Sequence, residues 1–490
     1  MTQVLIIGAG PAGLAAAQSA RRAGAEVILL DSSDSLGGQY WRHLPESRPA
    51  RKEAMLHHGW ARFQSLATEL VSDPGCEIIS RAHVWAIETG ERPTVHAVIG
   101  ESDGRDRKRI SFHPTALIIA TGAYDRTLPF PGWDLPGVFT AGAAQALAKG
   151  ERLAVGQRVV VAGAGPFLLP VTQSLAAAGS RVVAVLEANR AIPLMRGWLP
   201  KAWQLLPAAS KGLELAGYAA GHIRHRIPYL LGRTVIAANG TTAVESVTTA
   251  RLDRDWVPIP GTEKTIPVDA VCVSHSFTPR LELALAAGCQ LTPDRFVQVD
   301  RRQETTIPGV FAAGEVTGIG GVDLSLAEGS IAGRYAAGAS GTNPTLERKR
   351  AVFSGFAARI EAAHGIRGGW PAWLTESTTI CRCEEVSYGS LCATSQTTDS
   401  SSLRSLKLST RAGLGICQGR ICGRTIEDLL ARQTPGGALT DGSVSDRRPI
   451  AIPIRMGELA SPPEAHSEHP PTPAKTSAVA QRLHEREHHD

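Results

Sequence analysis

The sequence is poor in aromatic residues and has no long apolar run. Aromatics make up 5% of its 490 residues, and no stretch reaches the roughly 18 apolar residues that a transmembrane helix needs. Lysine and arginine (51) barely exceed aspartate and glutamate (46) and form no long basic run, which argues against nucleic acid as a partner. The first residues, MTQVLIIGAG, lead straight into an apolar run, so we expect no targeting segment. We expect a cytoplasmic protein without a transmembrane segment, which leaves peripheral membrane association open.

Paired redox cysteines are missing from the two nucleotide-binding regions that the sequence indicates. Neither region contains a C-x-x-C or C-x4-C pair, which disfavours disulfide reductase activity. The scattered residues Cys76, Cys272, Cys289 and Cys392 are expected to be structural thiols in a reducing compartment.

The first nucleotide-binding pattern is VLIIGAGPAG, followed by an alanine-rich segment and a second apolar run that ends in Asp31. Gly8 permits a tight turn, Gly10 lets a pyrophosphate approach the backbone, and Gly13 lets a helix pack closely on the strand. The helix N-terminus then offers N–H groups and a partial positive charge to the phosphates. Asp31 is spaced to bind ribose hydroxyls. The pattern predicts a Rossmann-type fold.

The second pattern, RVVVAGAGPFLLPVTQSL, keeps Gly163 and Gly165 but has Leu168 at the third glycine position. A leucine at this helix–strand contact should move the helix outward and alter the phosphate site. Glu187 ends the following strand and is spaced to bind ribose hydroxyls. We expect a second Rossmann-type domain that binds NAD(P) or another adenine nucleotide, the alternative being an empty scaffold.

Two apolar strands, ending in ATG at 120–122 and in AAGE at 312–315, tie the first domain to a flavin. With GAGPAG they resemble the FAD fingerprints of the thioredoxin reductase and glutathione reductase superfamily. That family usually has Glu at the position of Asp31 and Asp at the position of Glu315, which affects contact geometry rather than the cofactor. The helix opened by 325–337 is expected to point its N-terminus at the flavin ring. By resemblance, the FAD site consists of Gly8, Gly10, Pro11, Ala12, Gly13, Asp31, Gly38, Gln39, Thr121, Gly122, Gly314 and Glu315.

Cysteines near the end of the sequence form the pattern C-x-C-x33-C-x4-C, namely Cys381, Cys383, Cys417 and Cys422. Four thiolates suit either zinc or a [2Fe–2S] cluster, and this spacing departs from the C-x2-C knuckles of a zinc ribbon. Basic neighbours would moderate the negative charge of a cluster, and the glycines of RAGLGICQGRICGR free N–H groups for its sulfurs. We therefore favour a [2Fe–2S] site over zinc or a metal-free segment, with Cys392 outside the ligand set.

These patterns predict an α/β protein with two Rossmann-type dinucleotide-binding domains, a small C-terminal [2Fe–2S] domain and a disordered tail. The C-terminal domain resembles the bacterioferritin-associated ferredoxin type. The expected boundaries are 1–126 with 276–342 for a discontinuous FAD-binding domain, 127–275 for the second Rossmann domain, 343–376 for a linker, 377–432 for the [2Fe–2S] domain, and 433–490 for an extended strap and the tail.

The whole arrangement resembles the alpha subunits of hydrogen cyanide synthase, the opine (octopine and nopaline) oxidases and hydroxyproline dehydrogenase. TGAYDRTLPFPGWDLPGVFTAGAAQAL and CRCEEV…TRAGLGICQGRICG carry this resemblance. It implies a D-amino-acid-oxidase-like FAD beta subunit that oxidises the C–N bond, a small additional subunit, and an electron-relay role for this chain. The catalytic residues are unknown, and His275 is expected to be structural rather than flavin-proximal. The alternatives are a self-sufficient NAD(P)H-dependent reductase and a non-enzymatic redox sensor.

Overall fold

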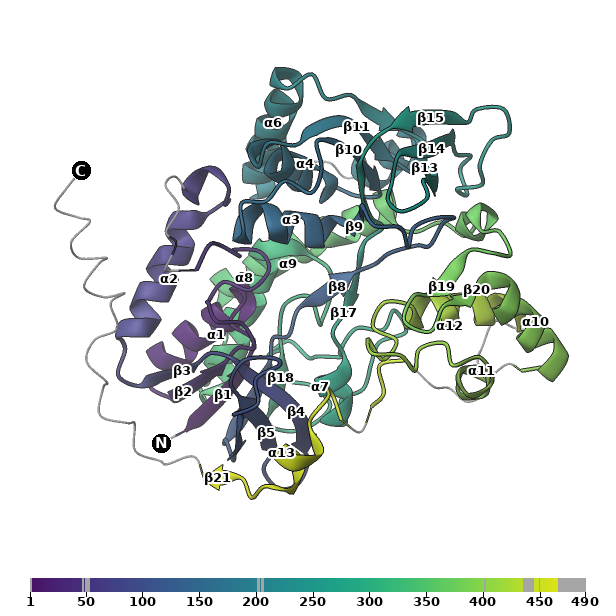
Figure 1. Ribbon diagram of the computed structural model, residues 1–490. Helices are drawn as coiled ribbons and strands as arrows, with labels where there is room; N and C mark the ends of the chain where they lie inside the picture. Colours follow the sequence, from purple (N-terminus) through teal and green to yellow (C-terminus); the bar gives the residue numbers. More distant parts are fainter. Residues whose placement is uncertain are drawn as a thin grey trace. The chain divides into compact units, whose positions relative to one another are not determined.

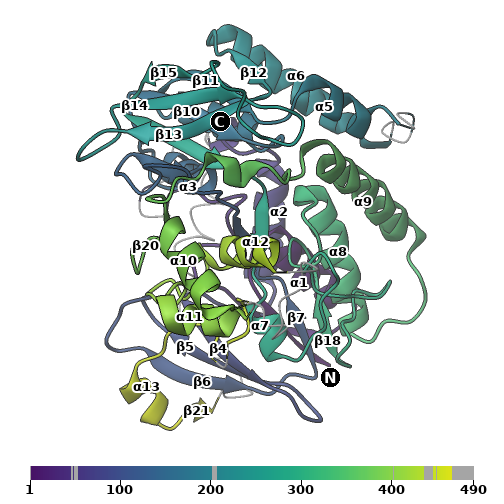
Figure 2. The same ribbon diagram turned by 90° about the vertical axis from the view of Figure 1, so that its right-hand side faces the viewer.

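The computed structural model describes residues 2–45, 48, 53–200, 203, 207–400, 402–434, 445–448 and 450–465. Its chain forms two units (Figures 1 and 2). Unit 1 consists of Met1–Ala123, Pro279–Ser354 and Arg448–Asp490, and unit 2 of Tyr124–Thr278 and Gly355–Arg447. Within the described ranges, no helix has the length and apolar content to cross a membrane.

A parallel sheet forms the centre of unit 1. In spatial order its strands are β18 (Val310–Ala312), β7 (Ala116–Ile119), β1 (Gln3–Ile7), β2 (Glu26–Leu30) and β3 (Cys76–Ile79). Because side chains alternate along a strand, Val4 and Ile6 belong to one apolar core, and Leu5 and Ile7 to another. The first core is closed by α1 (Pro11–Arg22), α2 (Trp60–Ser72) and α8 (Gly321–Ala336). The second is closed by the antiparallel strands β4 (Ala82–Glu88), β5 (Thr94–Ile99) and β6 (Lys108–Phe112), and by α7 (Glu282–Ala286).

Helices α1 and α8 approach each other so closely that glycine is required at their contact (Figure 1). A Cβ atom added at Gly329 would lie 2.0 Å from the carbonyl oxygen of Ala12. One turn further, a Cβ atom at Gly333 would lie 2.0 Å from the carbonyl oxygen of Ala16. Two backbones therefore pack directly, and this contact fixes α8 beside the helix that follows the first glycine-rich turn.

Unit 2 repeats the parallel sheet with a second set of strands. In spatial order these are β12 (Tyr229–Leu231), β11 (Arg181–Glu187), β10 (Arg158–Gly163), β16 (Ala270–Ser274) and β9 (Val138–Thr140). A separate antiparallel sheet contains β13 (Arg233–Asn239), β14 (Ser246–Arg251) and β15 (Lys264–Pro267). The helices of this part are α3 (Ala141–Gly150), α4 (Leu168–Ala177), α5 (Ala191–Trp198) and α6 (Ala209–Arg224). The segments that connect the two units contain β8 (Ala123–Asp125) and β17 (Phe277–Pro279), which pair with each other.

The remainder of unit 2 contains the four cysteines. Helix α9 (Pro344–His364) leads from unit 1 into unit 2, and the short 3₁₀ helix η3 (Trp370–Trp373) follows it. The cysteine-containing part then comprises β19 (Thr379–Cys381), β20 (Val386–Ser387), α10 (Tyr388–Thr398), α11 (Leu403–Thr410) and α12 (Gly423–Gln433). Figure 2 shows α10, α11 and α12 as one group, in green to yellow.

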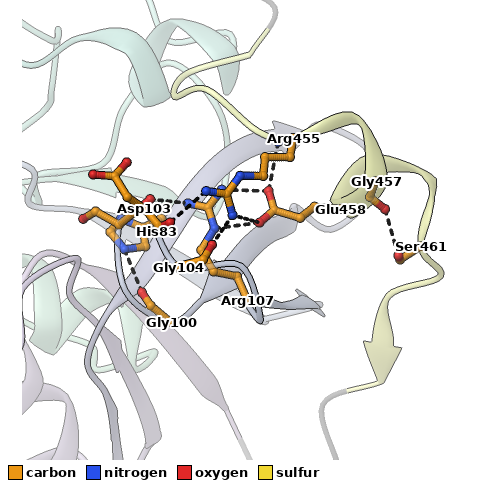
Figure 3. A network of polar contacts seen from close by, with 10 residues as sticks. His83, Gly100, Asp103, Gly104, Arg107, Arg455, Gly457, Glu458 and Ser461 are labelled. Carbon is orange, nitrogen blue, oxygen red and sulfur yellow. Dashed lines mark hydrogen bonds and ion pairs between the residues drawn. The ribbon is translucent and has the colours of Figure 1, made fainter.

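A C-terminal segment, residues 450–465, returns to unit 1 (Figure 3). The N–H of Ala451 donates to the carbonyl of Trp85 in β4. The segment contains α13 (Met456–Ala460) and β21 (Glu464–Ala465), which pairs with β6. Arg107 donates from Nε and Nη2 to the two carboxylate oxygens of Glu458 at 2.7 Å each, and both side chains are buried. The guanidinium of Arg107 lowers the pKa of Glu458. An ion pair with two hydrogen bonds thus anchors this strap. The disordered tail was expected from Ser461, but Glu464 and Ala465 form β21, and the rest of the predicted tail lies outside the described residues.

The α1–α8 contact predicts a sharp difference between two Gly→Ala substitutions. Gly329→Ala should destabilise unit 1 by about 1–3 kcal/mol, because its Cβ would overlap backbone that cannot yield cheaply. Gly217→Ala in α6 has nothing within 4 Å of the new Cβ and should be neutral or stabilising by roughly 1 kcal/mol. Urea unfolding of both variants measures the difference, and equal midpoints would contradict the packing described here.

Candidate functional site

The glycine-rich turn after β1 forms a cradle that only glycine residues allow. Gly8 has φ +107°, and a Cβ there would lie 2.3 Å from the carbonyl oxygen of Ala120. A Cβ at Gly13 would lie 1.8 Å from the carbonyl oxygen of Gly8, so the helix rests directly on the turn. Helix α1 begins at Pro11 with no side chain capping its N-terminus, which leaves that end to an anionic ligand. These residues fit the pyrophosphate of a dinucleotide.

Asp31, the predicted ribose ligand, lies at the end of β2 and points its carboxylate at this cradle. Its Oδ2 accepts from the N–H of Ala9 at 2.6 Å, and its Oδ1 accepts from the N–H of Ser33 at 2.7 Å. The side chain remains partly exposed. A carboxylate oxygen can accept more than one hydrogen bond, so this arrangement orients Asp31 and still leaves room for ribose hydroxyls.

The other predicted FAD residues lie on loops of unit 1. Gly38 faces the cradle, since a Cβ there would lie 2.8 Å from the Cα of Gly10. Gln39 is exposed and accepts a hydrogen bond from Arg42. After the end of β7, the hydroxyl of Thr121 donates to the carbonyl of Arg280. The N–H of Arg280 donates in turn to the carbonyl of Gly122. Glu315 follows β18 and is partly buried. Their contacts with FAD stay predictions.

Sequence reasoning missed Glu328, a buried carboxylic acid beneath the turn after β18. Its Oε2 accepts from the N–H of Gly314 at 2.9 Å and from the hydroxyl of Thr317 at 2.8 Å. Burial raises the pKa of Glu328 to about 7. The acid sits in α8, which begins at Gly321 and so starts four residues earlier than we expected. A glutamate amid the small residues of SLAEGSIAG was the available signal.

The second glycine-rich turn, which has Leu168 in place of the third glycine, differs from the first in where its helix begins. In the first turn the N–H of Leu14 donates to the carbonyl of Gly10, as in an α-helix, and α1 starts at once. In the second, the N–H of Leu169, the residue equivalent to Leu14, donates to the carbonyl of Pro166, three residues back, at 3.1 Å. Leu168 stands at the position of Gly13. The leucine is fully buried, and α4 begins only there. The N-terminal turn that would hold phosphate is therefore displaced from the glycines.

Glu187, the predicted ribose ligand of the second site, is fully buried and surrounded by protein donors. Its Oε2 accepts from the N–H of Gly165 at 2.9 Å, and its Oε1 accepts from the N–H of Asn189 at 3.0 Å. His364, at the end of α9, lies 3.2 Å from Oε2 through its Nδ1, and its Nε2 accepts from the indole of Trp198. The Asp31 side chain is thus partly exposed to solvent, whereas the Glu187 side chain is fully buried. Ribose binding by Glu187 stays a prediction that would require His364 to move.

The four predicted cluster ligands lie together in unit 2. Through their sulfurs, Cys422 is hydrogen-bonded to both Cys381 and Cys417, and Cys417 is also bonded to Cys383. The bond with Cys422 lowers the pKa of Cys381 to about 6 and that of Cys417 to about 4. The sulfurs thus form a chain of contacting pairs. In the part of the chain that the structure describes, no three or more His, Cys, Asp or Glu side chains surround a point that could hold a single metal ion.

Backbone N–H groups surround these sulfurs, as a [2Fe–2S] site requires. The N–H of Gly413 donates to the sulfur of Cys381 at 3.4 Å, and backbone groups of Gly419 and Ile421 donate to Cys417. The positive φ values of Gly413 and Gly419, +83° and +80°, turn the loop toward the sulfurs. The residues present therefore fit a cluster with sulfur ligands.

The cysteines differ in exposure. Cys381 and Cys422 are 1% and 2% exposed and belong to an apolar core, whereas Cys383 is exposed and Cys417 is intermediate. We call Cys381 and Cys422 the inner pair and Cys383 and Cys417 the outer pair. Cys392 lies on α10, where its sulfur accepts from the amide of Gln433.

The apolar core that holds the inner pair also contains residues of the second Rossmann-type fold. A hydrogen-bonded path runs from Glu187 through the amide of Asn189 to the indole of Trp256, at 3.0 and 3.2 Å. Trp256 stacks on Trp373 of η3 with ring centroids 6.1 Å apart, and its carbonyl accepts from the Trp373 indole. The second fold therefore supports the cysteine-containing domain through the residues that border its own nucleotide position.

His275 follows β16 and is fully buried near the rings of Trp256 and Trp373. Burial, and then the nearby Arg126, lower its pKa to about 3, so the ring is neutral. Among the described residues, neither ring nitrogen has a hydrogen-bond partner. Its surroundings within unit 2 are those of a packed side chain.

Known proteins with this arrangement supply the class. Residues 2–341 match the pyridine nucleotide-disulphide oxidoreductase family, and residues 379–432 match the BFD-like [2Fe–2S] binding domain. The structure also resembles an L-proline dehydrogenase of P. horikoshii, with a TM-score of 0.66 at 21% identity over 94% of this chain and 79% of that one. The fold and these two family matches define a flavoprotein oxidoreductase that carries FAD and a [2Fe–2S] cluster.

One relative, a subunit of the opine oxidase of Agrobacterium tumefaciens, is 31% identical over 94% of this chain and 92% of its own length. Another, the HcnB subunit of the hydrogen cyanide synthase of Pseudomonas protegens, is 29% identical over 91% and 95%. The chain belongs to the family that contains these two proteins.

The cluster assignment predicts different iron contents for two Cys→Ser substitutions. Cys417→Ser removes a sulfur that contacts two other ligands and should lose most iron and inorganic sulfide. Cys392→Ser is the matched control and should keep both, because its sulfur bonds only groups outside the ligand set. Chemical iron and sulfide analysis measures this, and equal loss in both variants would contradict the assignment.

Glu328 predicts a pH-dependent stability. Its folded pKa, about 7, is raised above the ordinary value of 4.5, so the folded state holds the proton more tightly and loses stability as pH rises from about 4.5 to 7. The glutamine of Glu328→Gln cannot ionise. The free energy of unfolding of this variant, relative to that of the natural protein, should therefore rise by up to about 3 kcal/mol between pH 5 and pH 8. Urea unfolding at both pH values measures the gain, and a constant difference between the two proteins would rule it out.

Proposed function

We propose that this chain is the electron-transfer subunit of a hetero-oligomeric, FAD-dependent dehydrogenase that oxidises the C–N bond of an amine, opine or imino acid. One observation carries the proposal: a sulfur-ligand site is joined to the fold where a reductase would bind NAD(P)H, and that nucleotide position is closed by His364. Named relatives that are subunits of opine oxidase and hydrogen cyanide synthase support the substrate class.

When bound, FAD exchanges electrons in pairs or singly, and a [2Fe–2S] cluster exchanges them one at a time. The chain's own residues hold these groups and set their surroundings. Asp31 and the uncapped N-terminus of α1 hold the nucleotide half of FAD. The inner pair of cysteines would hold the cluster from an apolar core, and backbone N–H groups such as that of Gly413 would moderate the charge on the sulfurs.

A self-sufficient NAD(P)H reductase is the weaker alternative. Nicotinamide dinucleotide would need a helix N-terminus at the second glycine turn and an accessible carboxylate for ribose. Helix α4 begins only at Leu168, so its N-terminus does not lie at the glycine turn. The carboxylate of Glu187 is fully buried and therefore not accessible to ribose. Electrons from a separate flavoprotein subunit need neither, which favours a partner as their source.

Helix α6 supports assembly with another subunit. None of its described side chains is buried, and Leu213 and Ile223 are each 78% exposed. A helix with this much uncovered apolar surface needs a partner. Residues 190–226 contain six Lys or Arg and a single Glu, so the matching face should be acidic at its rim. We propose that this partner is a D-amino-acid-oxidase-like FAD beta subunit, with a small additional subunit completing the complex.

The test is to purify the chain alone and together with a candidate D-amino-acid-oxidase-like flavoprotein subunit from the same organism. We expect an opine, imino acid or amine to reduce the chain's flavin and cluster only in the complex, followed by absorbance and EPR. Leu213→Glu should lower recovery of the complex at least tenfold, because it places a charge on an apolar contact. Met456→Glu, 79% exposed on α13, adds the same charge elsewhere and should not.

Two results would overturn the proposal. One is rapid reduction of the isolated chain's flavin by NADH or NADPH, which would establish the reductase. The other is reduction of the isolated chain by an amine substrate, which would make the partner unnecessary.

A further inference from the structure

Exposed apolar side chains lie beside the outer pair of cysteines. Ile416, directly before Cys417, is 89% exposed. Leu414 and Ile421 are 46% and 45% exposed. Removing an isoleucine side chain from water is favourable, so a surface that covers Ile416 during function would be stabilised by the contact.

Backbone contacts place this surface at the cluster site. A Cβ atom at Gly415 would lie 2.3 Å from the Cβ of Cys383, so the backbone between Leu414 and Ile416 runs against the exposed ligand. The sulfur of Cys417 is in turn hydrogen-bonded to that of Cys383. The outer pair and the two apolar side chains that flank Gly415 therefore belong to one exposed edge.

The charges around this edge are mostly positive. Arg382 separates Cys381 from Cys383 and is exposed, with its guanidinium over the ring of Trp133. Arg411 forms an ion pair of 2.6 Å with Glu384, and Glu385 adds one exposed carboxylate. No Asp or Glu occurs between residues 400 and 426, which contain five Lys or Arg: Arg404, Lys407, Arg411, Arg420 and Arg424.

We propose that this edge, formed by Cys383, Cys417, Leu414, Ile416 and Ile421, is the docking surface for a small acidic one-electron carrier protein. The apolar side chains supply the contact, and the basic residues orient a partner with an acidic rim. Redox encounters of this kind bury little surface, so a few apolar side chains are enough. The inference rests on the proposed electron-transfer function and adds where electrons leave the chain.

The outer pair is the favoured exit because it is the part of the cluster site that solvent reaches. The inner pair is separated from solvent by the core around Trp373 and Ile426. In each encounter the chain loses one electron and the carrier gains one, with no bond formed and no proton moved. Two encounters remove the pair of electrons that one C–N oxidation provides.

The experiment uses the cluster-loaded full chain, reduced chemically, and cytochrome b5 as the acidic carrier. Stopped-flow absorbance measures cytochrome reduction, and surface plasmon resonance measures binding of the two oxidised proteins. We expect saturable binding that weakens as salt rises. Ile416→Glu should lower both the affinity and the second-order rate constant about tenfold. Ile416→Val should keep the affinity and the rate constant of the natural protein, because it retains an apolar side chain. Met456→Glu is the control for added charge. Circular dichroism of the cluster should be unchanged in every variant.

Three outcomes would overturn the inference. The first is a rate constant and affinity for Ile416→Glu within twofold of the natural protein. The second is binding to cytochrome b5 that does not saturate or does not depend on salt. The third is loss of the complex with the flavoprotein subunit in Ile416→Glu, which would make the edge a subunit interface. Chemical reduction needs neither substrate nor partner subunit. The docking inference can therefore fail while the proposed function holds, and the proposed function can fail while the docking inference holds.

Discussion

The contact between Gly13 and the carbonyl oxygen of Gly8 is the constraint on which the cofactor sites depend. Where a helix can rest on the turn before it, its N-terminus faces that turn and a phosphate can be held there. The first fold satisfies this condition, and α8 then packs on α1 through glycines of its own. The second fold does not, because Leu168 fills the same position and delays the start of α4. The difference between Gly13 and Leu168 thus distinguishes two folds that share the order of four equivalent strands.

The second fold, whose helix starts late after its glycine turn, also serves as a support. Its nucleotide position is bordered by Glu187, which accepts from the chain's own backbone and from the end of α9. From that carboxylate, Asn189 and Trp256 continue to η3 and into the core that holds the inner pair of cysteines. A buried carboxylate with several donors is stable only while those donors stay in place. The carboxylate of Glu187 therefore helps to hold the linker and, through it, the cluster domain in place.

The sequence was enough for whatever depends on local backbone geometry. The two glycine turns and the strands before them follow from steric rules that act over a few residues. The cysteine spacing indicated the cluster for the same reason. Glu328 and His364 could not be found in this way, because their partners Gly314 and Glu187 come from other segments and meet them only after folding. The start of α8 was placed too late, since nothing in the local sequence caps it.

The unequal burial of the four cysteines makes the two sides of the cluster domain different for electron exchange. Thiolates in an apolar core lose the stabilisation that water gives to negative charge, whereas exposed thiolates keep it. Added charge on reduction is therefore better tolerated on the side of Cys383 and Cys417, where solvent and basic side chains are near. The fold that supports the inner pair is also the one whose nucleotide position is closed. Both features favour electron exchange through the exposed edge over delivery from a nicotinamide bound in the second fold.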